Sequence, residues 1–302
     1  MGTTYWMTQK LSFLNKKSIK NCNFKPHIFE AFLLYCMPNS NSPIGIFDSG
    51  LGGLSILNEI HKILPKENII YYADSQNAPY GEKSKEDIIK FSIKNIEFLL
   101  KKSCKIIVVA CNTATTNAIH VLREKFDIPF IGIEPAIKPA SIQSKSKQIG
   151  ILATKGTLSS ELFAQNLKKI RENSDIIEVV GRGIVEAIEN NTTQSPEFLK
   201  TLNTQLEPFI KSNIDHLVLG CSHYPLIINE LKNIVDRKVN IIDSGYAVAK
   251  QTKNILSSHK LLCHKESTQK SILLYKNNTS DEALNNVIKR LQLKDIKVVN
   301  NY

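Results

Sequence analysis

From Ile44 onward, the sequence alternates short apolar runs with amphipathic stretches of helical length. The first four runs are IGIF, IIYYA, KIIVVA and PFIGI, and the stretches that follow them lie at 54–64, 84–102, 114–125 and 135–143. Short continuous apolar runs are typical of strands buried on both faces, and their alternation with helices places them in a parallel sheet. The pattern therefore predicts an α/β fold with a mostly parallel sheet flanked by helices.

The pattern begins again near residue 148, which indicates a second, similar lobe. IGIFDSG at 44 resembles IGILATKG at 149, and IIVVACNT at 106 resembles DHLVLGCSH at 215, in the same order. Helices are expected near 158–171, 184–190, 196–212 and 225–236, with strands at QIGILAT, IIEVVG, HLVLGC and VNIID between and after them. We expect lobe 1 to comprise 43–137 plus 246–302 and lobe 2 to comprise 138–245, with the active site in the cleft between them.

Residues 1–42 differ from the rest of the chain. They carry five lysines between Lys10 and Lys25 and a single acidic residue, Glu30, which interrupts the apolar stretch IFEAFLLYCM at 28–37. A secretory signal peptide, the alternative, would have an uninterrupted apolar run and a small-residue cleavage site. We expect an N-terminal extension, disordered or the product of a misassigned start, with the folded protein beginning near Met37. Deleting residues 1–36 should leave folding and activity intact, and loss of soluble protein would contradict this.

Composition limits the partners and cofactors of the chain. The formal charge is +11, but the lysines are scattered and no nucleic-acid-binding motif is present, so nucleic acid is not an expected partner. No apolar run approaches the roughly 18 to 20 residues that a membrane-spanning helix needs. The six cysteines form no CxxC pair and no zinc-binding pattern occurs. We expect a cytoplasmic protein with reduced thiols, without a metal or membrane partner.

Polar and reactive residues gather where the predicted strands end. In open α/β sheets, ligands bind beyond the carboxyl ends of the strands, where loops lead into helices. Four segments fall at such ends: Asp48–Gly53, Cys111–Thr115, Ala153–Thr157, which contains Thr154, and Cys221–Tyr224. These segments are the predicted site.

Cys111 and Cys221 hold matched positions in the two lobes, each ending an apolar strand and preceding polar residues. Two thiols that face each other across a cleft can remove a proton from one side of a carbon and return one on the other, which inverts a stereocentre. A cysteine hydrolase, the alternative, needs a single nucleophile and would leave the second thiol unexplained. Of the other cysteines, two are expected to be small buried apolar residues and two to lie outside the folded core: Cys104 and Cys263, and Cys22 and Cys36.

The stretch FDSGLGGLSIL at 47–57 places Asp48 and Ser49 at a strand end before a glycine-rich turn. It matches neither a dinucleotide-binding nor a P-loop motif. In the structural interpretation, the turn simply starts a helix that Asp or Ser caps. In the functional one, Asp48 assists a thiol and the backbone of the turn binds an anionic ligand.

Three further residues have both a structural and a functional interpretation. His223 lies two residues after Cys221, close enough to assist that thiol as acid or base. Tyr80 lies in the turn NAPYGEKS, which is structural unless it closes over the cleft. Glu189, in IVEAIEN, is by default an exposed helix residue.

Four motifs together, IGIFDSGLGGL, ADSQNAPYGEKS, VVACNTATT and LGCSHYPLI, resemble those of the glutamate racemases over residues 44–302. The resemblance implies a two-lobed, cofactor-independent enzyme that makes D-glutamate for peptidoglycan, and we expect a homodimer. It implies that Cys111 deprotonates D-glutamate with support from Asp48, and that Cys221 deprotonates L-glutamate with support from His223. Substrate contacts are implied at the residues that match the family's positions: Asp48, Ser49, Tyr80, Gly81, Asn112, Thr113, Ser222 and His223.

Two positions depart from the family pattern. Ser222 stands where threonine is usual, which keeps the hydroxyl, and GRGIVEAIE at 181–189 replaces the family's CP…VE stretch, so that Glu189 matches its glutamate only loosely. Aspartate racemases share the two cysteines, but their first strand enters a different glycine-rich turn. A binding module built on a decayed racemase fold is disfavoured because both cysteines, Asp48 and His223 are intact.

Overall fold

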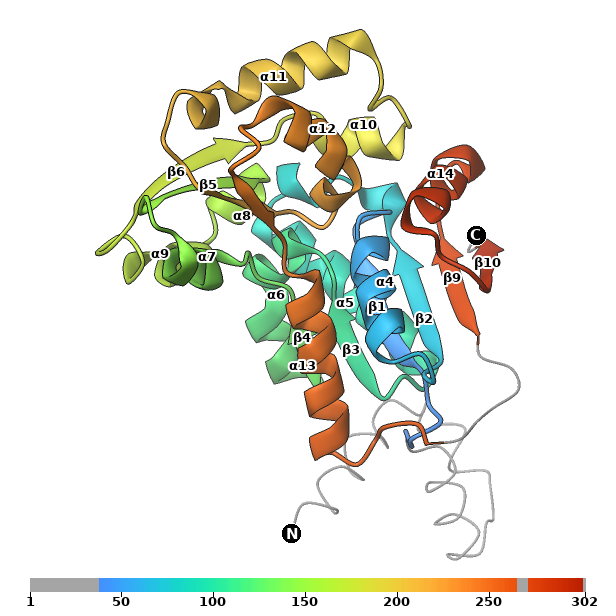
Figure 1. Ribbon diagram of the computed structural model, residues 1–302. Helices are drawn as coiled ribbons and strands as arrows, with labels where there is room; N and C mark the ends of the chain where they lie inside the picture. Colours follow the sequence, from blue (N-terminus) through green and yellow to red (C-terminus); the bar gives the residue numbers. More distant parts are fainter. Residues whose placement is uncertain (1–37, 265–270, 301–302) are drawn as a thin grey trace, which may run out of the picture.

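The computed structural model describes residues 38–264 and 271–300. Most of the expected N-terminal extension, with Cys22 and Cys36, lies outside these residues. The described chain forms two parallel sheets, each covered by helices. The two sheets meet end to end (Figure 1). The predicted fold class is confirmed.

The first sheet has six strands in the order β10-β9-β2-β1-β3-β4, and every neighbouring pair is parallel. Side chains alternate between its faces, as the two-residue repeat of a strand requires. Ile46 packs with α4, α13 and α14 on one face, whereas the neighbouring Phe47 packs with α5 and α6 on the other. Its strands are β1 (Ile44–Asp48), β2 (Ile69–Ala73), β3 (Ile106–Val109), β4 (Phe130–Gly132), β9 (Ile272–Lys276) and β10 (Ile296–Asn300). Its helices are α4 (Leu54–Ile63), α5 (Lys85–Lys101), α6 (Asn112–Lys125), α13 (Gly245–Ser258) and α14 (Asp281–Leu291).

The second sheet has four parallel strands in the order β6-β5-β7-β8. Leu217 and Leu219 of β7 pack with α10, α11 and α12, and Val218 packs with α7 and α9 on the opposite face. The strands are β5 (Gln148–Ala153), β6 (Asp175–Val180), β7 (His216–Gly220) and β8 (Asn240–Ile242). The helices are α7 (Ile137–Gln143), α8 (Lys155–Leu158), α9 (Glu161–Lys168), α10 (Ile184–Glu189), α11 (Pro196–Ile210) and α12 (Ile228–Ile234).

Two predicted helices differ in detail from the structure. The helix expected near 158–171 is α9, which begins at Glu161 because the Ser160 hydroxyl caps it by accepting a hydrogen bond from Phe163 N, and the short helix α8 precedes it. The helix expected near 225–236 begins as the 3-10 turn η3 (Tyr224–Ile227) and continues as α12. Two more 3-10 turns, η1 (Ser75–Asn77) and η2 (Tyr80–Glu82), follow β2.

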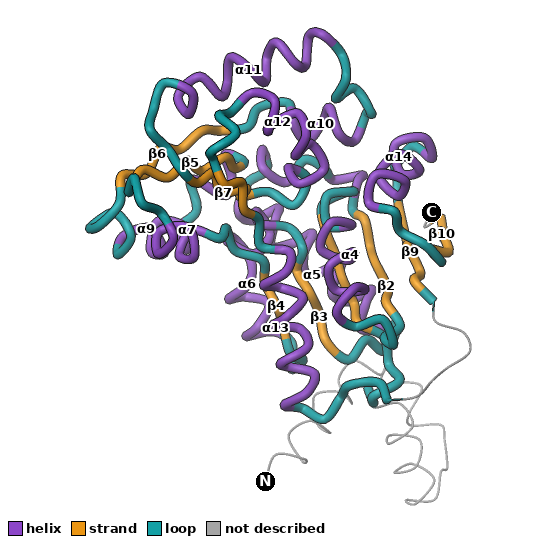
Figure 2. Tube along the Cα trace, in the orientation of Figure 1, coloured by secondary structure: helices purple, strands orange, loops and turns teal. Residues whose placement is uncertain are grey.

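The chain passes from the first sheet to the second through α7 and returns through α13, which packs on α4 and β4 (Figure 2). Strands β9 and β10 then complete the first sheet beside β2. The lobe boundaries at 137/138 and 245/246 stay a prediction with which these strand orders agree.

A buried ion pair closes the end of the first sheet remote from the second lobe. Lys105 Nζ lies 2.5 Å from Glu67 Oε2 and donates hydrogen bonds to the carbonyls of Ser40 and Leu261. Glu67 in turn accepts from the backbone N–H of Cys263. Cys104 is fully buried as expected, but Cys263 is half-buried and the expectation of a buried thiol there is wrong.

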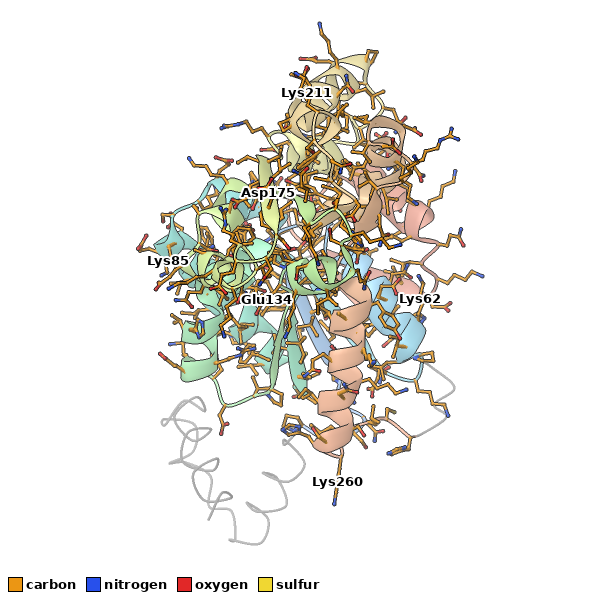
Figure 3. All side chains as sticks on the ribbon, turned by 60° about the vertical axis from the view of Figure 1, so that its left-hand side comes forward. Lys62, Lys85, Glu134, Asp175, Lys211 and Lys260 are labelled. Atoms are coloured by element: carbon orange, nitrogen blue, oxygen red, sulfur yellow. The ribbon has the colours of Figure 1, made fainter. Side chains whose placement is uncertain are left out.

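The lysines labelled in Figure 3 do not cluster on one part of the surface. Lys62, Lys85, Lys211 and Lys260 point outward from four different elements or their ends. Across residues 38–264 and 271–300, none of the helices combines the length and apolar character needed to cross a bilayer.

Candidate active site

The carboxyl ends of the central strands of both sheets face each other and bring the predicted segments together. Asp48 ends β1, Cys111 precedes α6 directly after β3, and Cys221 follows β7. All three are buried, with relative exposures of 0%, 4% and 7%. Ser222, which directly follows Cys221, donates a hydrogen bond to Asp48, so the Cys221 segment of one lobe contacts the site residues of the other.

Cys111 occupies the N-cap of α6. Its Sγ accepts a hydrogen bond from Ala114 N at 3.4 Å, and its thiol donates to Ser49 Oγ at 3.7 Å. Burial and then the charge of Asp48 raise the pKa of Cys111, whereas the contacts with Ala114 and Ser49 lower it. The balance keeps Cys111 protonated in this closed arrangement, with a helix N-terminus and a hydroxyl ready to stabilise the thiolate.

Cys221 is linked to a histidine and a carboxylate. His223 Nδ1 lies 3.9 Å from Cys221 Sγ, and His223 Nε2 lies 2.7 Å from Glu189 Oε1. Burial alone would lower the pKa of His223, but the hydrogen bonds and negative charges of Cys221 and Glu189 raise it well above its usual value. The imidazole is therefore well suited to take the proton of the Cys221 thiol.

Glu189 is not the exposed helix residue that its sequence context suggested. It ends α10, its side chain is 14% exposed, and its carboxylate reaches across to the other lobe. Oε1 accepts from Leu51 N at 2.6 Å and Oε2 accepts from Ser75 Oγ at 3.3 Å. The default interpretation fails because α10 ends at the lobe contact, which helical periodicity does not reveal.

Asp48 joins the two lobes at the centre of the site. Its carboxylate accepts a 2.7 Å hydrogen bond from Gly53 N and a 3.2 Å hydrogen bond from Ser222 Oγ of the other lobe. Burial raises the pKa of Asp48, and His223 and the Gly53 amide oppose that shift. Among the described residues, Asp48 has no hydrogen bond to Cys111, whereas the neighbouring Ser49 does.

The glycine-rich turn after β1 packs directly on the other lobe. A Cβ on Gly52 would lie 2.6 Å from His223 N, and a Cβ on Gly50 would overlap the Glu189 carboxylate. The anion-binding backbone predicted for this turn holds Glu189, through Leu51 N. The glycines are therefore explained by the close approach of the lobes.

The remaining predicted contact residues form a second group beside Cys111. Asn112 is 2% exposed, and within the described residues neither atom of its side-chain amide has a hydrogen-bond partner. Thr113 Oγ1 lies 2.8 Å from Thr154 Oγ1 of the other lobe. A Cβ on Gly81 would lie 2.8 Å from Thr154 Cβ, which places the Gly81 turn against the same residue. Asn112 is thus a buried polar side chain suited to a polar ligand.

Sequence reasoning missed the residues that hold the Tyr80 turn. The Tyr80 hydroxyl donates to Asp74 Oδ2 at 2.6 Å, and Asp74 also accepts from Asn95 and from Asn277, at the end of β9. Asp74 directly follows β2, so the strand-end rule would have found it. Asn277 directly follows β9, so the same rule applies to it, but sequence does not show that β9 lies beside β2.

Metal ligands do not gather in the described part of the chain: no group of three or more His, Cys, Asp or Glu side chains there could hold a metal ion. What the arrangement offers chemically is two thiols, one imidazole and two carboxylates. Each can accept or donate a proton.

The chain is similar to proteins of known family and known structure. Residues 44–252 match the model of the Asp/Glu/hydantoin racemase family. The glutamate racemase of Ralstonia pickettii is 45% identical over 219 residues, which cover 72% of this chain and 78% of that protein. Among solved structures, the RacE1 isoform of glutamate racemase from Bacillus anthracis superposes with a TM-score of 0.77 at 30% identity, covering 87% of this chain and 98% of that one. The structure of Escherichia coli glutamate racemase in complex with L-glutamate and the activator UDP-MurNAc-Ala superposes with a TM-score of 0.74 at 30% identity, covering 85% of this chain and 98% of that one.

Proposed function

The chain belongs to the Asp/Glu/hydantoin racemase family as one of its glutamate racemases, and from this premise we propose a two-thiol mechanism. In it, Cys111 and Cys221 take and return the α-proton of glutamate on opposite faces of the α-carbon. The observation that carries the proposal is the placement of two buried thiols at matched strand ends of two opposed sheets, joined across the lobes by the hydrogen bond from Ser222 to Asp48.

For L-glutamate, we assign proton removal to Cys221. His223 accepts the thiol proton at Nδ1, and Glu189 fixes the imidazole through Nε2. The raised pKa of His223 helps the imidazole hold that proton while it is paired with Glu189. Cys111, protonated in the closed site, then delivers its proton to the other face of the α-carbon.

For D-glutamate, the roles are reversed and Cys111 removes the proton. We assign to Asp48 a supporting part for Cys111, because its buried carboxylate adjoins Ser49, which bonds to the thiol, and its charge raises the pKa of Cys111. The Ala114 amide and the Ser49 hydroxyl stabilise the Cys111 thiolate once it forms. Microscopic reversibility requires each thiol to act as the base in one direction and the acid in the other.

The substrate's carboxylates need donors in the same buried region. We assign this to Ser49, Asn112, Thr113 and Ser222, with the Gly81 backbone and, as a further contact, Thr154. Asn112 supports the assignment because its amide is buried without a protein partner among the described residues. Tyr80 would contribute through its backbone, since its hydroxyl is already bonded to Asp74.

The test follows α-proton exchange in D₂O and the optical signal of purified protein with L- and D-glutamate and with L-aspartate. We expect exchange and racemisation of both glutamate enantiomers. Exchange with L-aspartate but not with either glutamate would overturn the substrate, and the presence of L-glutamate in the Escherichia coli neighbour supports glutamate.

The thiols are tested by Cys111→Ser and Cys221→Ser, separately. Each should reduce turnover by orders of magnitude, because a hydroxyl is a far weaker acid than a thiol and would replace one of two essential proton carriers. The buried Cys104→Ser serves as the control for general loss of a thiol. Wild-type racemisation by either site variant would contradict the mechanism.

The family also supports proposals about cellular context. We propose that the D-glutamate formed enters peptidoglycan synthesis in the cytoplasm, that the protein acts as a homodimer, and that it uses neither metal nor organic cofactor. Rescue of a D-glutamate-requiring bacterial strain, light scattering of the purified protein, and activity after exhaustive dialysis against a chelator test these three points in turn.

A further inference from the structure

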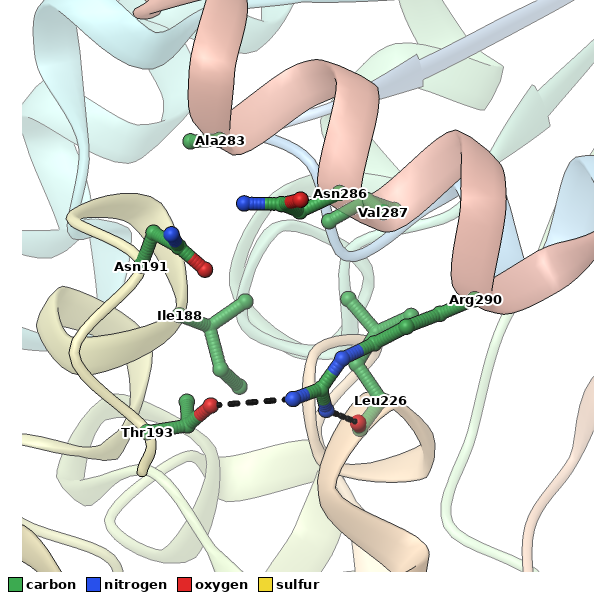
Figure 4. Close-up of a pocket in the computed structure, with 8 residues that line it drawn as sticks. All are labelled: Ile188, Asn191, Thr193, Leu226, Ala283, Asn286, Val287 and Arg290. Atoms are coloured by element: carbon green, nitrogen blue, oxygen red, sulfur yellow. Dashed lines mark hydrogen bonds between the residues drawn. The ribbon is translucent and has the colours of Figure 1, made fainter. Parts of the chain in front are cut away.

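Helix α14 of the first sheet lies against the second lobe. It contacts α10 and η3, and apolar side chains from both sides meet at the contact, among them Ile188, Leu226 and Val287 (Figures 1 and 4). At the end of this contact, Arg290 extends its guanidinium across the boundary between α14 and the second lobe, which we call the seam. Its Nη1 donates to Leu226 O at 2.6 Å and its Nη2 donates to Thr193 Oγ1 at 3.2 Å (Figure 4).

The two acceptors of Arg290 lie on the segments that carry the proton relay of Cys221. Leu226 belongs to η3, and its backbone N–H donates to the carbonyl of His223 at 2.9 Å. Thr193 follows Glu189 by four residues, just beyond the end of α10. We propose that Arg290 is a positioning residue that holds these two segments together, and thereby keeps His223 and Glu189 at hydrogen-bonding distance.

The chemistry of the guanidinium suits the proposed positioning role of Arg290. Its planar fork has fixed donor directions and can bridge two acceptors at once, which a lysine cannot do. Glu230 of α12, whose side chain is 9% exposed, lies 3.5 Å from Nη1 and adds an ion pair to the same group. A second bond across the seam, from Asn191 Nδ2 to Glu282 Oε1 at 3.1 Å, joins α14 to the end of α10.

The inference rests on the proposed roles of His223 and Glu189. Arg290 contacts neither the thiols nor Asn112, so its loss should misplace the relay without removing a substrate contact. Small displacements of a catalytic group can cost one to two orders of magnitude in rate. We expect Arg290→Gln to lower kcat by roughly 10-fold with KM within about twofold, and Arg290→Lys, which can still reach one acceptor, to recover part of the loss.

The controls separate positioning from general destabilisation. Lys289→Gln removes an exposed charge from the adjacent position of α14 and should leave kcat unchanged. Thr193→Ala, which removes one acceptor only, should lower kcat in the same direction but less, and it serves if Arg290→Gln does not fold. Thermal unfolding of each variant verifies the folded state at the assay temperature.

The decisive measurement is a double-mutant cycle with Glu189→Gln. If Arg290 acts through the relay, adding Arg290→Gln to Glu189→Gln should cost little more than Glu189→Gln alone. A fully additive loss, or a kcat of Arg290→Gln equal to that of Lys289→Gln, would overturn the inference. Full activity of Glu189→Gln itself would instead overturn the proposed function of the relay.

Discussion

Replacing Glu189 by glutamine removes the negative charge that raises the pKa of His223, while the side chain keeps nearly the same size and shape. The carboxylate accepts from His223 Nε2 at 2.7 Å and from Leu51 N at 2.6 Å, and its side chain is 14% exposed. Glutamine can still accept from Leu51, but it cannot offer a charged acceptor to the imidazolium. A hydrogen bond to a charged group contributes about 1.5–3 kcal/mol, and about 1.4 kcal/mol corresponds to a tenfold change in rate, so kcat/KM should fall between ~10- and ~100-fold.

The same substitution should also change the pH dependence of kcat/KM, in a direction that the structure predicts. Glu189 and Cys221 raise the pKa of His223, and Asp48 is the other charged group that interacts with it. Loss of the Glu189 charge lowers that pKa, so the imidazolium loses its proton at lower pH. The alkaline limb of kcat/KM for L-glutamate should therefore move to lower pH in Glu189→Gln, as measured by the optical assay from pH 6 to about 10.

Glu186→Gln is the matched control, because Glu186 lies on the same helix and is exposed. It removes the same charge without touching His223. Equal activity of the Glu186 and Glu189 variants, with superimposable pH profiles, would refute the assignment of Glu189 to the relay.

Three further perturbations test other parts of the structure. Gly52→Ala should reduce activity at least 10-fold with the fold retained, because the new Cβ would displace His223, with circular dichroism as the check on folding. Lys105→Met should lower the free energy of unfolding by about 3–5 kcal/mol in urea titrations, since it leaves Glu67 buried without its ion pair, and adding Glu67→Gln should restore part of it. Burial would raise the pKa of Asp215, but hydrogen bonds with His216, Ser144 and the backbone amides of Lys145 and Ser146 lower it below its usual value. Its stabilisation is therefore present above about pH 4 and is lost as pH falls through the folded pKa. Asp215→Asn should accordingly be less stable than wild type at pH 7, with the difference shrinking in acid.

The strands and the cysteine pair could be predicted from sequence because local pattern decides them. The buried run before Cys111 and the matching run before Cys221 each had to be a central strand, and parallel strands carry such residues to one edge. The exact start of α9 was missed because a single hydroxyl cap, Ser160, decides it, and periodicity does not reveal such a cap.

The contacts between lobes could not be predicted in the same way. Glu189 and Arg290 lie where two elements distant in sequence meet, and neither residue type is unusual for an exposed helix. The side-chain bond from Ser222 to Asp48 spans 174 positions of the chain. Only the packing of the two sheets determines which of many polar residues lie where the lobes meet.

The bonds that complete the site belong to both lobes, and this has a consequence for timing. Leu51 N holds Glu189, and Asp48 holds Ser222, only while the two sheets are together. Both thiols are too buried for glutamate to reach them without some separation of the lobes. In the mechanism we propose, a separation that admits substrate therefore breaks these bonds, and the relay is complete only when the lobes are together around the substrate.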